Sequence, residues 1–260
     1  DVYKRQVWSM YDYNRGCCDN ICYSGLADLF RLPKFGLLYF RTQMKEGTFT
    51  PAGPMTYEVF INSHWLEGSS DTLQVYGNVD EVKLQLNGRV IARQYPDDKP
   101  STSEYVSRPD GGNAENIDFP PFTFFNVNWE RGELKAIGYK DGKAVAEHVV
   151  RTPGAVEAMD ITYFESGVSA SCRDLLIVYV NLKDLQGTGC FGENNREVKL
   201  EVLQGGELRG PATIKAEAGV ASFLVATTDS PMLVLKAVSG NLETMRKLSL
   251  IHISEPTRRV

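Results

Sequence analysis

The sequence predicts a mainly β fold in which two immunoglobulin-like β-sandwiches follow a strand–loop–helix unit. Three observations support this prediction. Short runs in which apolar and polar residues alternate recur between residues 57 and 242, and a strand with one buried face has this period of two. Turn-forming residues separate the runs at short intervals, as in sandwiches. Residues 7–46 instead lead into a pattern with helical spacing.

The strand–loop–helix unit, residues 7–46, begins with a short apolar run at 7–11 that suits a buried strand. Residues 12–20 are polar and rich in turn formers, which predicts a loop. A helix is expected over 35–44, with Pro33 in its first turn, where the missing N–H costs little. The apolar face of that helix consists of Leu37, Leu38, Phe40 and Met44. A unit this small cannot bury its own apolar side chains, so it is expected to pack on something larger.

Residues 47–56, which include two prolines and two glycines, predict a linker to the first sandwich at 57–154. Within that sandwich, Asn87-Gly88 between two alternating runs predicts a two-residue hairpin turn. Such a turn would pair Leu86 with Arg89 and Leu84 with Ile91, and Asp141-Gly142 predicts a second hairpin. The expected strands are 57–61, 72–76, 82–86, 90–94, 122–127, 134–139 and 145–151.

A second sandwich is predicted at 155–242, because alternating runs resume there and turns are marked by Gly205-Gly206 and Ala218-Gly219. Its expected strands are 160–164, 175–182, 198–203, 213–216, 220–226 and 232–237. Residues 243–260 are expected to form a tail. Residues 1–6 and 248–260 resemble translated sequencing adaptors, so we leave them out of the fold prediction.

The composition of the chain argues against several classes of function. Hydrophobic residues make up 42% and charged residues 23% of the 260 positions, which is ordinary for a globular chain. A net charge of -5 without a basic stripe argues against nucleic-acid binding, and no apolar run approaches a membrane span. Cys17, Cys18 and Cys22 cluster without a nearby histidine, so neither a metal nor a cofactor is expected. Whether Cys172 and Cys190 form a disulfide stays open.

Several motifs together resemble glycoside hydrolase family 2, which includes β-galactosidases, β-glucuronidases and β-mannosidases. Trp8-Ser-Met-Tyr-Asp-Tyr-Asn-Arg-Gly16 and Ser24-Gly-Leu-Ala-Asp-Leu-Phe-Arg-Leu-Pro-Lys34 look like the end of its catalytic (β/α)₈ barrel. Phe119-Pro-Pro-Phe-Thr-Phe124 and Gly132-Glu-Leu-Lys-Ala-Ile-Gly-Tyr139 resemble the sandwich that follows the barrel. Lys215-Ala-Glu-Ala-Gly-Val-Ala221 is similar to a further sandwich. Residues 7–46 would then be the last βα unit of the barrel.

The resemblance implies a retaining β-glycosidase as the parent protein, in which one glutamate protonates the leaving oxygen and another attacks the anomeric carbon. Both glutamates are expected upstream, so this chain should contain no catalytic residue. Trp8, Asp12 and Asn14 are the predicted substrate-binding residues, at the end of a barrel strand. The alternatives are a buried core tryptophan and turn-forming Asp and Asn. The implied partner is a carbohydrate, such as a β-galactoside.

Several other interpretations of the sequence stay open. A non-enzymatic immunoglobulin-like protein that binds carbohydrate or acts at a cell surface is the alternative function, and edge strands leave room for a homo-oligomer. His64-Trp65 and Trp129 could form a carbohydrate platform, although core tryptophans are commoner. His148 is expected on a solvated face, and Tyr105 and Arg108 lie in a long polar loop. A periplasmic or extracellular location is expected for the parent.

Overall fold

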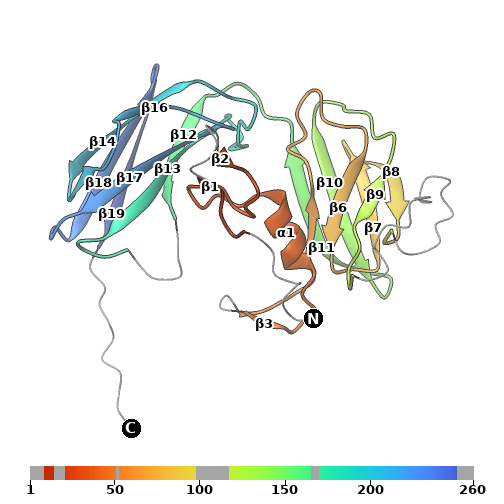
Figure 1. The fold of residues 1–260 in the computed structure, drawn as a ribbon. Coiled ribbons are helices and arrows are strands. Elements are labelled where there is room, and N and C mark those ends of the chain that lie inside the picture. The colour runs from red at the N-terminus through yellow and green to blue at the C-terminus, as the bar shows by residue number, and fades with distance from the viewer. Residues whose placement is uncertain (1–8, 15–20, 51–52, 98–116, 165–169, 251–260) are drawn as a thin grey trace, which may run out of the picture. The chain divides into compact units, whose positions relative to one another are not determined.

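The computed structural model describes residues 9–14, 21–50, 53–97, 117–164 and 170–250. The chain divides into two compact units, Asp1–Thr152 and Pro153–Val260. Antiparallel strands dominate both units, and the described residues contain a single helix (Figure 1). The predicted mainly β fold class is therefore confirmed.

The sandwich of the first unit consists of two antiparallel sheets. One has the order β5-β6-β9 and the other the order β11-β10-β7-β8. The strands of the first sheet are β5 (Val59–Ile61), β6 (Leu73–Gly77) and β9 (Phe122–Phe124). Those of the second are β7 (Glu81–Leu86), β8 (Arg89–Gln94), β10 (Glu133–Lys140) and β11 (Lys143–Arg151). All seven fall within a few residues of the predicted strands.

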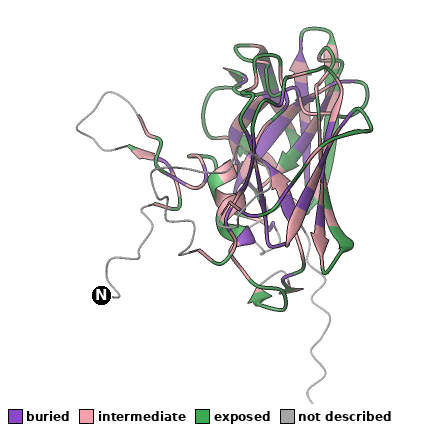
Figure 2. Cartoon of the chain, turned by 90° about the vertical axis from the view of Figure 1, so that its right-hand side faces the viewer, coloured by how far each residue is buried: buried purple, intermediate pink, exposed green. Residues whose placement is uncertain are grey.

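The two sheets share one hydrophobic core, to which each strand contributes alternate side chains. In β7, Val82, Leu84 and Leu86 are buried while their neighbours are partly exposed, as the period of two requires. Buried residues, coloured purple, recur along the strands in Figure 2. Trp65 is fully buried in this core, and its Nε1 donates to the carbonyl of Glu130 at 3.0 Å. Trp65 is therefore a core tryptophan, the commoner of the two alternatives, and does not belong to an exposed carbohydrate platform.

The β7–β8 hairpin confirms the predicted turn and corrects its register. Asn87 and Gly88 have φ values of 50° and 79°, the left-handed conformation that this turn needs. Leu86 pairs with Arg89 as expected, but Leu84 pairs with Ala92 because a β-bulge leaves Ile91 as an extra residue. The predicted Leu84–Ile91 pair is therefore wrong. The bulge turns Ile91 toward solvent, where it is 37% exposed.

His148 of β11 joins the two sheets of the first unit. Its Nδ1 accepts a hydrogen bond from the backbone N–H of Ile61 in β5 at 3.2 Å, and its ring packs edge-on against Phe60 at 5.6 Å. Burial lowers the pKa of His148, because the charged imidazolium would lose its hydration. The expectation of a solvated face residue is therefore wrong.

Residues 9–14 and 21–50 form an irregular segment that packs on this sandwich. It contains β1 (Tyr13–Asn14), β2 (Ile21–Cys22) and α1 (Phe35–Thr42). Pro33 precedes the N-cap residue Lys34, so its predicted place in the first helical turn is wrong. The helix rests on the edge of β6, where the rings of Tyr39 and Tyr76 meet at 5.3 Å.

Two further short strand pairs depart from the sequence prediction. Strand β1 pairs with β2, within and just after the stretch predicted as a loop. The expected linker contains β3 (Phe49–Thr50) and β4 (Gly53–Pro54), which pair with each other. Both pairs are only two residues long, so no hydrophobic period marks them.

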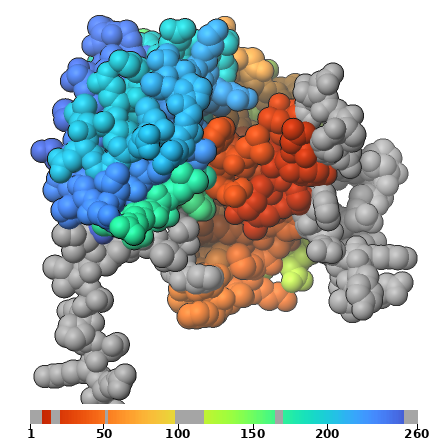
Figure 3. Space-filling model, turned by 60° about the vertical axis from the view of Figure 1, so that its left-hand side comes forward, coloured from red at the N-terminus to blue at the C-terminus, as the bar shows by residue number. Residues whose placement is uncertain are grey.

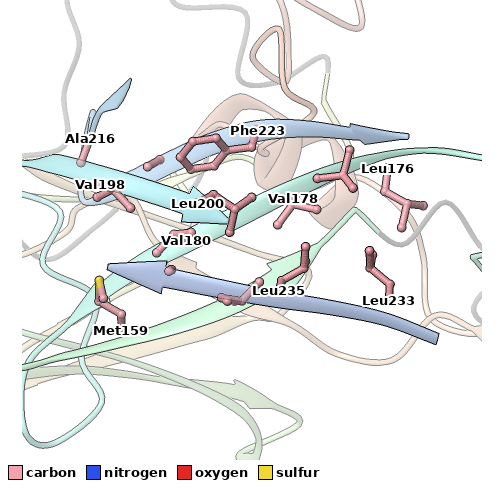
Figure 4. Close-up of a cluster of buried hydrophobic side chains, with 14 of the residues drawn as sticks. Met159, Leu176, Val178, Val180, Val198, Leu200, Ala216, Phe223, Leu233 and Leu235 are labelled. Carbon is pink, nitrogen blue, oxygen red and sulfur yellow. The ribbon is translucent and has the colours of Figure 1, made fainter. Parts of the chain in front are cut away.

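The second unit is a sandwich of two four-stranded sheets, with the orders β12-β13-β17-β15 and β16-β14-β18-β19. The strands of the first sheet are β12 (Ala158–Tyr163), β13 (Leu175–Lys183), β15 (Gly206–Leu208) and β17 (Val220–Thr227). Those of the second are β14 (Glu197–Gln204), β16 (Thr213–Lys215), β18 (Met232–Ser239) and β19 (Leu242–Ser249). Figure 4 shows side chains from both sheets meeting in the core, among them Val178, Leu200 and Phe223.

Strand β19 corrects the predicted tail at 243–260. It pairs with β18 from Ser249 opposite Met232 to Leu242 opposite Ser239. Leu250 is buried in the core at 3% exposure, and its N–H donates to the carbonyl of Pro231 at 2.8 Å. The second sandwich therefore extends eight residues beyond the predicted end at 242, because the sheet needs this edge strand to cover its core.

Cys172 and Cys190 do not form a disulfide in this unit. Cys172 lies near the carbonyl of Ser230 at 3.5 Å, whereas the buried Cys190 faces the carbonyl of Gly154 at 3.8 Å. Both are free thiols.

Candidate functional site

The segment singled out by the sequence is held together by backbone hydrogen bonds between two stretches of chain. The N–H groups of Leu26 and Ala27 donate to the carbonyls of Ser9 and Met10, and the Asp12 N–H donates back to Ala27 at 3.0 Å. Tyr11 thereby forms a parallel bridge with Ala27. This arrangement resembles a short parallel strand pair.

Gly25 is required where these stretches meet. A Cβ at this position would lie 2.2 Å from the backbone nitrogen of Asp12 and 2.5 Å from the Ala27 oxygen. No other residue allows so close an approach of the two backbones. The close contact in turn brings the Gly25 N–H to the Asp12 side chain.

Asp12 is the buried polar centre of this segment. It is only 5% exposed, and its Oδ1 accepts hydrogen bonds from the Gly25 N–H at 2.9 Å and from Lys34 Nζ at 2.6 Å. Lys34 also donates to the Tyr23 carbonyl at 3.2 Å. The carboxylate thus connects the strand, the following loop and the start of α1, a bracing arrangement that differs from the predicted contact with a sugar hydroxyl.

The other predicted binding residues lie on either side of Asp12. Asn14 ends β1, opposite Ile21, and is exposed. Trp8 lies outside the described residues, immediately before Ser9, so the structure does not place its ring. Tyr105 and Arg108 of the long loop are also outside the described residues, as are Cys17 and Cys18.

Sequence reasoning missed the residues that hold Asp12. Lys34 lies 22 positions away from Asp12 in the sequence. Arg31, whose guanidinium stacks on the Tyr11 ring at 3.8 Å from the centroid, was also missed. Neither contact has a local sequence signal. Only a motif that spans both stretches could have revealed them.

The outer surface of the segment carries several large apolar side chains. Met10 is 53% exposed, Tyr23 70%, Leu29 40% and Phe30 38%. Figure 3 shows the surface of residues 21–50 in red and orange, facing the viewer. Exposed apolar side chains gathered on one segment are typical of a surface that packs against further protein.

Two classes of site find no support among the residues that the structure describes. No group of three or more Cys, His, Asp or Glu side chains there could hold a metal ion. No helix in these ranges has the length and apolar character needed to cross a bilayer.

Comparison with known proteins finds similar sequences and folds over most of the chain. The model of a family described as "Domain of unknown function (DUF4982)" matches residues 68–146, within the first sandwich. A β-galactosidase of Thermoanaerobacter pseudethanolicus is 31% identical over 250 residues, which is 89% of this chain and 31% of that protein. The chain thus spans about a third of the curated relative.

Solved structures show the same fold. A β-glucuronidase from glycoside hydrolase family 2 has a TM-score of 0.68 at 20% identity, over 89% of this chain and 23% of that one. A β-glycosidase from Bacteroides vulgatus has a TM-score of 0.71 at 17% identity, over 93% of this chain and 30% of that one. Over most of its length this chain is similar to a β-galactosidase in sequence and to a member of glycoside hydrolase family 2 in fold. The resemblance of the motifs to glycoside hydrolase family 2 is therefore confirmed over most of the chain.

Proposed function

We propose that this chain is part of a retaining β-glycosidase that cleaves β-galactoside-like substrates. The observation that carries the proposal is the 31% identity to a β-galactosidase, because that match extends over 89% of the chain and includes more than one unit. Short shared motifs would be weaker support than continuous similarity of this length. The name of the B. vulgatus protein, a β-glycosidase, agrees with the proposed reaction class.

In this proposal, residues 7–46 are the last βα unit of a catalytic barrel. The exposed Met10, Tyr23 and Phe30 support it, since the adjoining parts of a barrel would cover such side chains. Barrel active sites lie at the C-terminal ends of the strands. Trp8 and Asn14 would contact the sugar there, while the buried Asp12 would hold the loop that carries them.

The retaining mechanism requires two carboxyl groups roughly 5 Å apart, one as acid and base and the other as nucleophile. Asp12 and Asp28, two of the described carboxylates of the segment, do not suit these roles. Asp12 is buried and bonded to Lys34, and Asp28 Oδ1 accepts the N–H groups of Phe30 and Leu32 at 2.8 Å. We therefore propose that the catalytic pair lies outside this chain and that the chain alone is inactive.

Activity assays test the two parts of the proposal separately. The purified chain is expected to release no nitrophenol from aryl β-galactosides or β-glucuronides, and turnover above the blank would show that it contains a catalytic pair. A longer protein that includes the upstream coding sequence is expected to cleave one of them. If that protein cleaves no aryl β-glycoside, the glycosidase assignment is wrong.

Substitution of Trp8 in the longer protein tests the binding role. Trp8→Ala should raise KM more than Trp129→Phe, because an indole offers a flat apolar surface to the C–H groups of a sugar face. Trp129 serves as the matched control, since it packs against the sandwich core. Equal KM values for the two variants would contradict the sugar contact of Trp8.

A further inference from the structure

The outer face of the sheet β12-β13-β17-β15 in the second unit contains a pocket of about 310 Å³. Met159, Val178 and Val180 point into the core (Figure 4). Successive side chains of a strand point to opposite faces, so Asp160 of β12 and Asn181 of β13 project outward. These two residues are paired across the strands and form the floor of the pocket.

The polar groups of the pocket hold one another in place. Asn181 Nδ2 donates to Asp160 Oδ1 at 2.9 Å and to Thr162 Oγ1 at 3.0 Å. Lys183 Nζ donates to Asp160 Oδ2 at 2.7 Å. The set combines donors and acceptors on rigid strands, and its single ammonium is balanced by its single carboxylate. The site is therefore close to electrically neutral.

An aromatic side chain and a tight turn form the walls. Phe191 lines the pocket and is 38% exposed, and its ring lies against Gly189, where an added Cβ would come within 2.9 Å of the ring. The turn at Ala218 and Gly219, whose φ values are 47° and 75°, also lines the pocket. A Cβ on Gly219 would lie 2.5 Å from the Cys190 oxygen, so this turn lies directly against the stretch that leads to Phe191.

We propose that this pocket binds a neutral pyranose residue of a glycan. Sugar hydroxyls both donate and accept hydrogen bonds, which matches the mixed amide, hydroxyl, carboxylate and ammonium groups. The apolar C–H face of the ring suits the exposed face of Phe191. A phosphate would need an excess of positive charge and an amine an excess of negative charge, and the pocket offers neither. A volume near 310 Å³ lies at the lower end of small-ligand sites.

This inference does not rest on the proposed glycosidase activity, because every residue it uses lies in the second unit. The test is a titration of the whole ¹⁵N-labelled chain with lactose and maltose at millimolar concentration, followed by NMR. The signals expected to shift are the Asn181 side-chain amide and the backbone amides of Gly189 and Phe191. Glucosamine and galacturonic acid serve as charged comparison ligands.

Amino-acid substitutions test whether the changes in the NMR signals report binding in the pocket. Phe191→Ala should weaken saccharide binding about tenfold, because it removes the aromatic wall. Thr162→Val keeps the side-chain shape, removes one hydroxyl and should weaken binding less. Leu185→Ala is the matched control, since Leu185 is 70% exposed on the neighbouring turn and outside the pocket. Each variant is checked for unchanged amide dispersion elsewhere in the unit.

The outcomes are decisive in both directions. Saccharide-induced shifts confined to the pocket, weakened by Phe191→Ala and unchanged by Leu185→Ala, would establish the site. The absence of shifts with either neutral sugar would overturn it. Binding of glucosamine or galacturonic acid as strong as that of lactose would overturn the assignment to neutral sugars.

Discussion

At the residue scale, Asp12 organises a stretch of chain that has little regular structure. Its carboxylate joins the Gly25 N–H and the Lys34 ammonium, three groups drawn from three successive parts of the segment. A buried donor or acceptor that loses its partner costs about 1–3 kcal/mol, more than the bond itself contributes. Asp12 therefore matters for stability even without contacting a ligand.

Asp12→Ala should destabilise the first unit by about 2 kcal/mol, because it leaves the Gly25 N–H without its acceptor. Asp12→Asn should destabilise the first unit less than Asp12→Ala. The amide oxygen can still accept the hydrogen bond from the Gly25 N–H, and only the negative charge that pairs with the Lys34 ammonium is lost. Chemical denaturation and exchange of the Gly25 amide measure both effects. Asp118→Asn is the control, because the Asp118–Lys45 pair is well exposed and contributes little. Equal destabilisation by Asp12→Ala and Asp118→Asn would contradict the bracing role.

His148 makes the stability of the first unit depend on pH. Its Nδ1 accepts the Ile61 N–H, so the neutral ring carries its proton on Nε2, and burial lowers the pKa of His148. A histidine with a lowered folded pKa contributes stability above its unfolded pKa, near 6.5. That contribution is lost as the pH falls through the folded pKa. The pKa of His64, which packs on Phe35 at 4.9 Å, is lowered by burial in the same direction.

The first unit should therefore become less stable as the pH falls below about 6.5. His148→Gln should weaken this dependence, because glutamine does not titrate while its side-chain oxygen can accept the Ile61 N–H. Denaturant midpoints measured from pH 7 to pH 5 give the slope for each protein. The same measurement on His64→Gln gives the contribution of His64 to the pH dependence, so the contributions of the two histidines can be distinguished. A slope unchanged by His148→Gln would show that its ring is not held neutral by burial.

At the element scale, the hairpin turns were the most predictable features. Asn87-Gly88, Asp141-Gly142 and Ala218-Gly219 all have two successive positive φ values, and the residue types that tolerate them are few. Long strands such as β7 and β17 were also predictable, since one buried face imposes a period of two over six to eight residues. Both signals are local in the sequence.

The features that sequence reasoning missed depend on distant partners. The bulge at Ile91 arises from how β8 lies on β7, and two-residue strands such as β1 carry no period. In the candidate site, the motif located Asp12 and Asn14 but not the burial of Asp12, because Lys34 and Gly25 approach it only after folding. His148 was misjudged for the same reason, as its partner Ile61 lies 87 residues away.

Strand β19 is the terminal element of the second unit, and its removal should destabilise that unit. It covers β18 along its whole length and is followed by the buried Leu250, while Leu248 packs on the core. A chain that ends at Leu242 should lose cooperative thermal unfolding of this unit or melt well below the full chain, since each buried leucine contributes about 1.5–3 kcal/mol.

A chain that ends at Leu250 is the matched control for this truncation. It keeps β19 and should melt like the full chain, because only residues 251–260 are removed. Differential scanning calorimetry of the three chains compares the transitions directly. If the chain that ends at Leu242 melts at the same temperature as the control, β19 does not contribute to the stability of the sheet.

At the scale of the whole molecule, each unit has its own hydrophobic core. The core of the first unit draws on β5 to β11, and that of the second on β12 to β19, with no residue common to both. The boundary falls between Thr152 and Pro153. Both units are of a size at which a single core can support a fold.

Each unit should therefore fold when it is produced separately as residues 1–152 or 153–260. Near-ultraviolet circular dichroism should show fixed aromatic environments in both pieces, and each should unfold cooperatively in denaturant. A cut after Gly210 is the control, because it separates β14 from β16 and β15 from β17 of the same sandwich and should leave neither part of the second unit folded. If a piece cut at Thr152 exposes apolar surface to a dye and lacks a cooperative transition, its core depends on the other unit, and the division into two folding units is wrong.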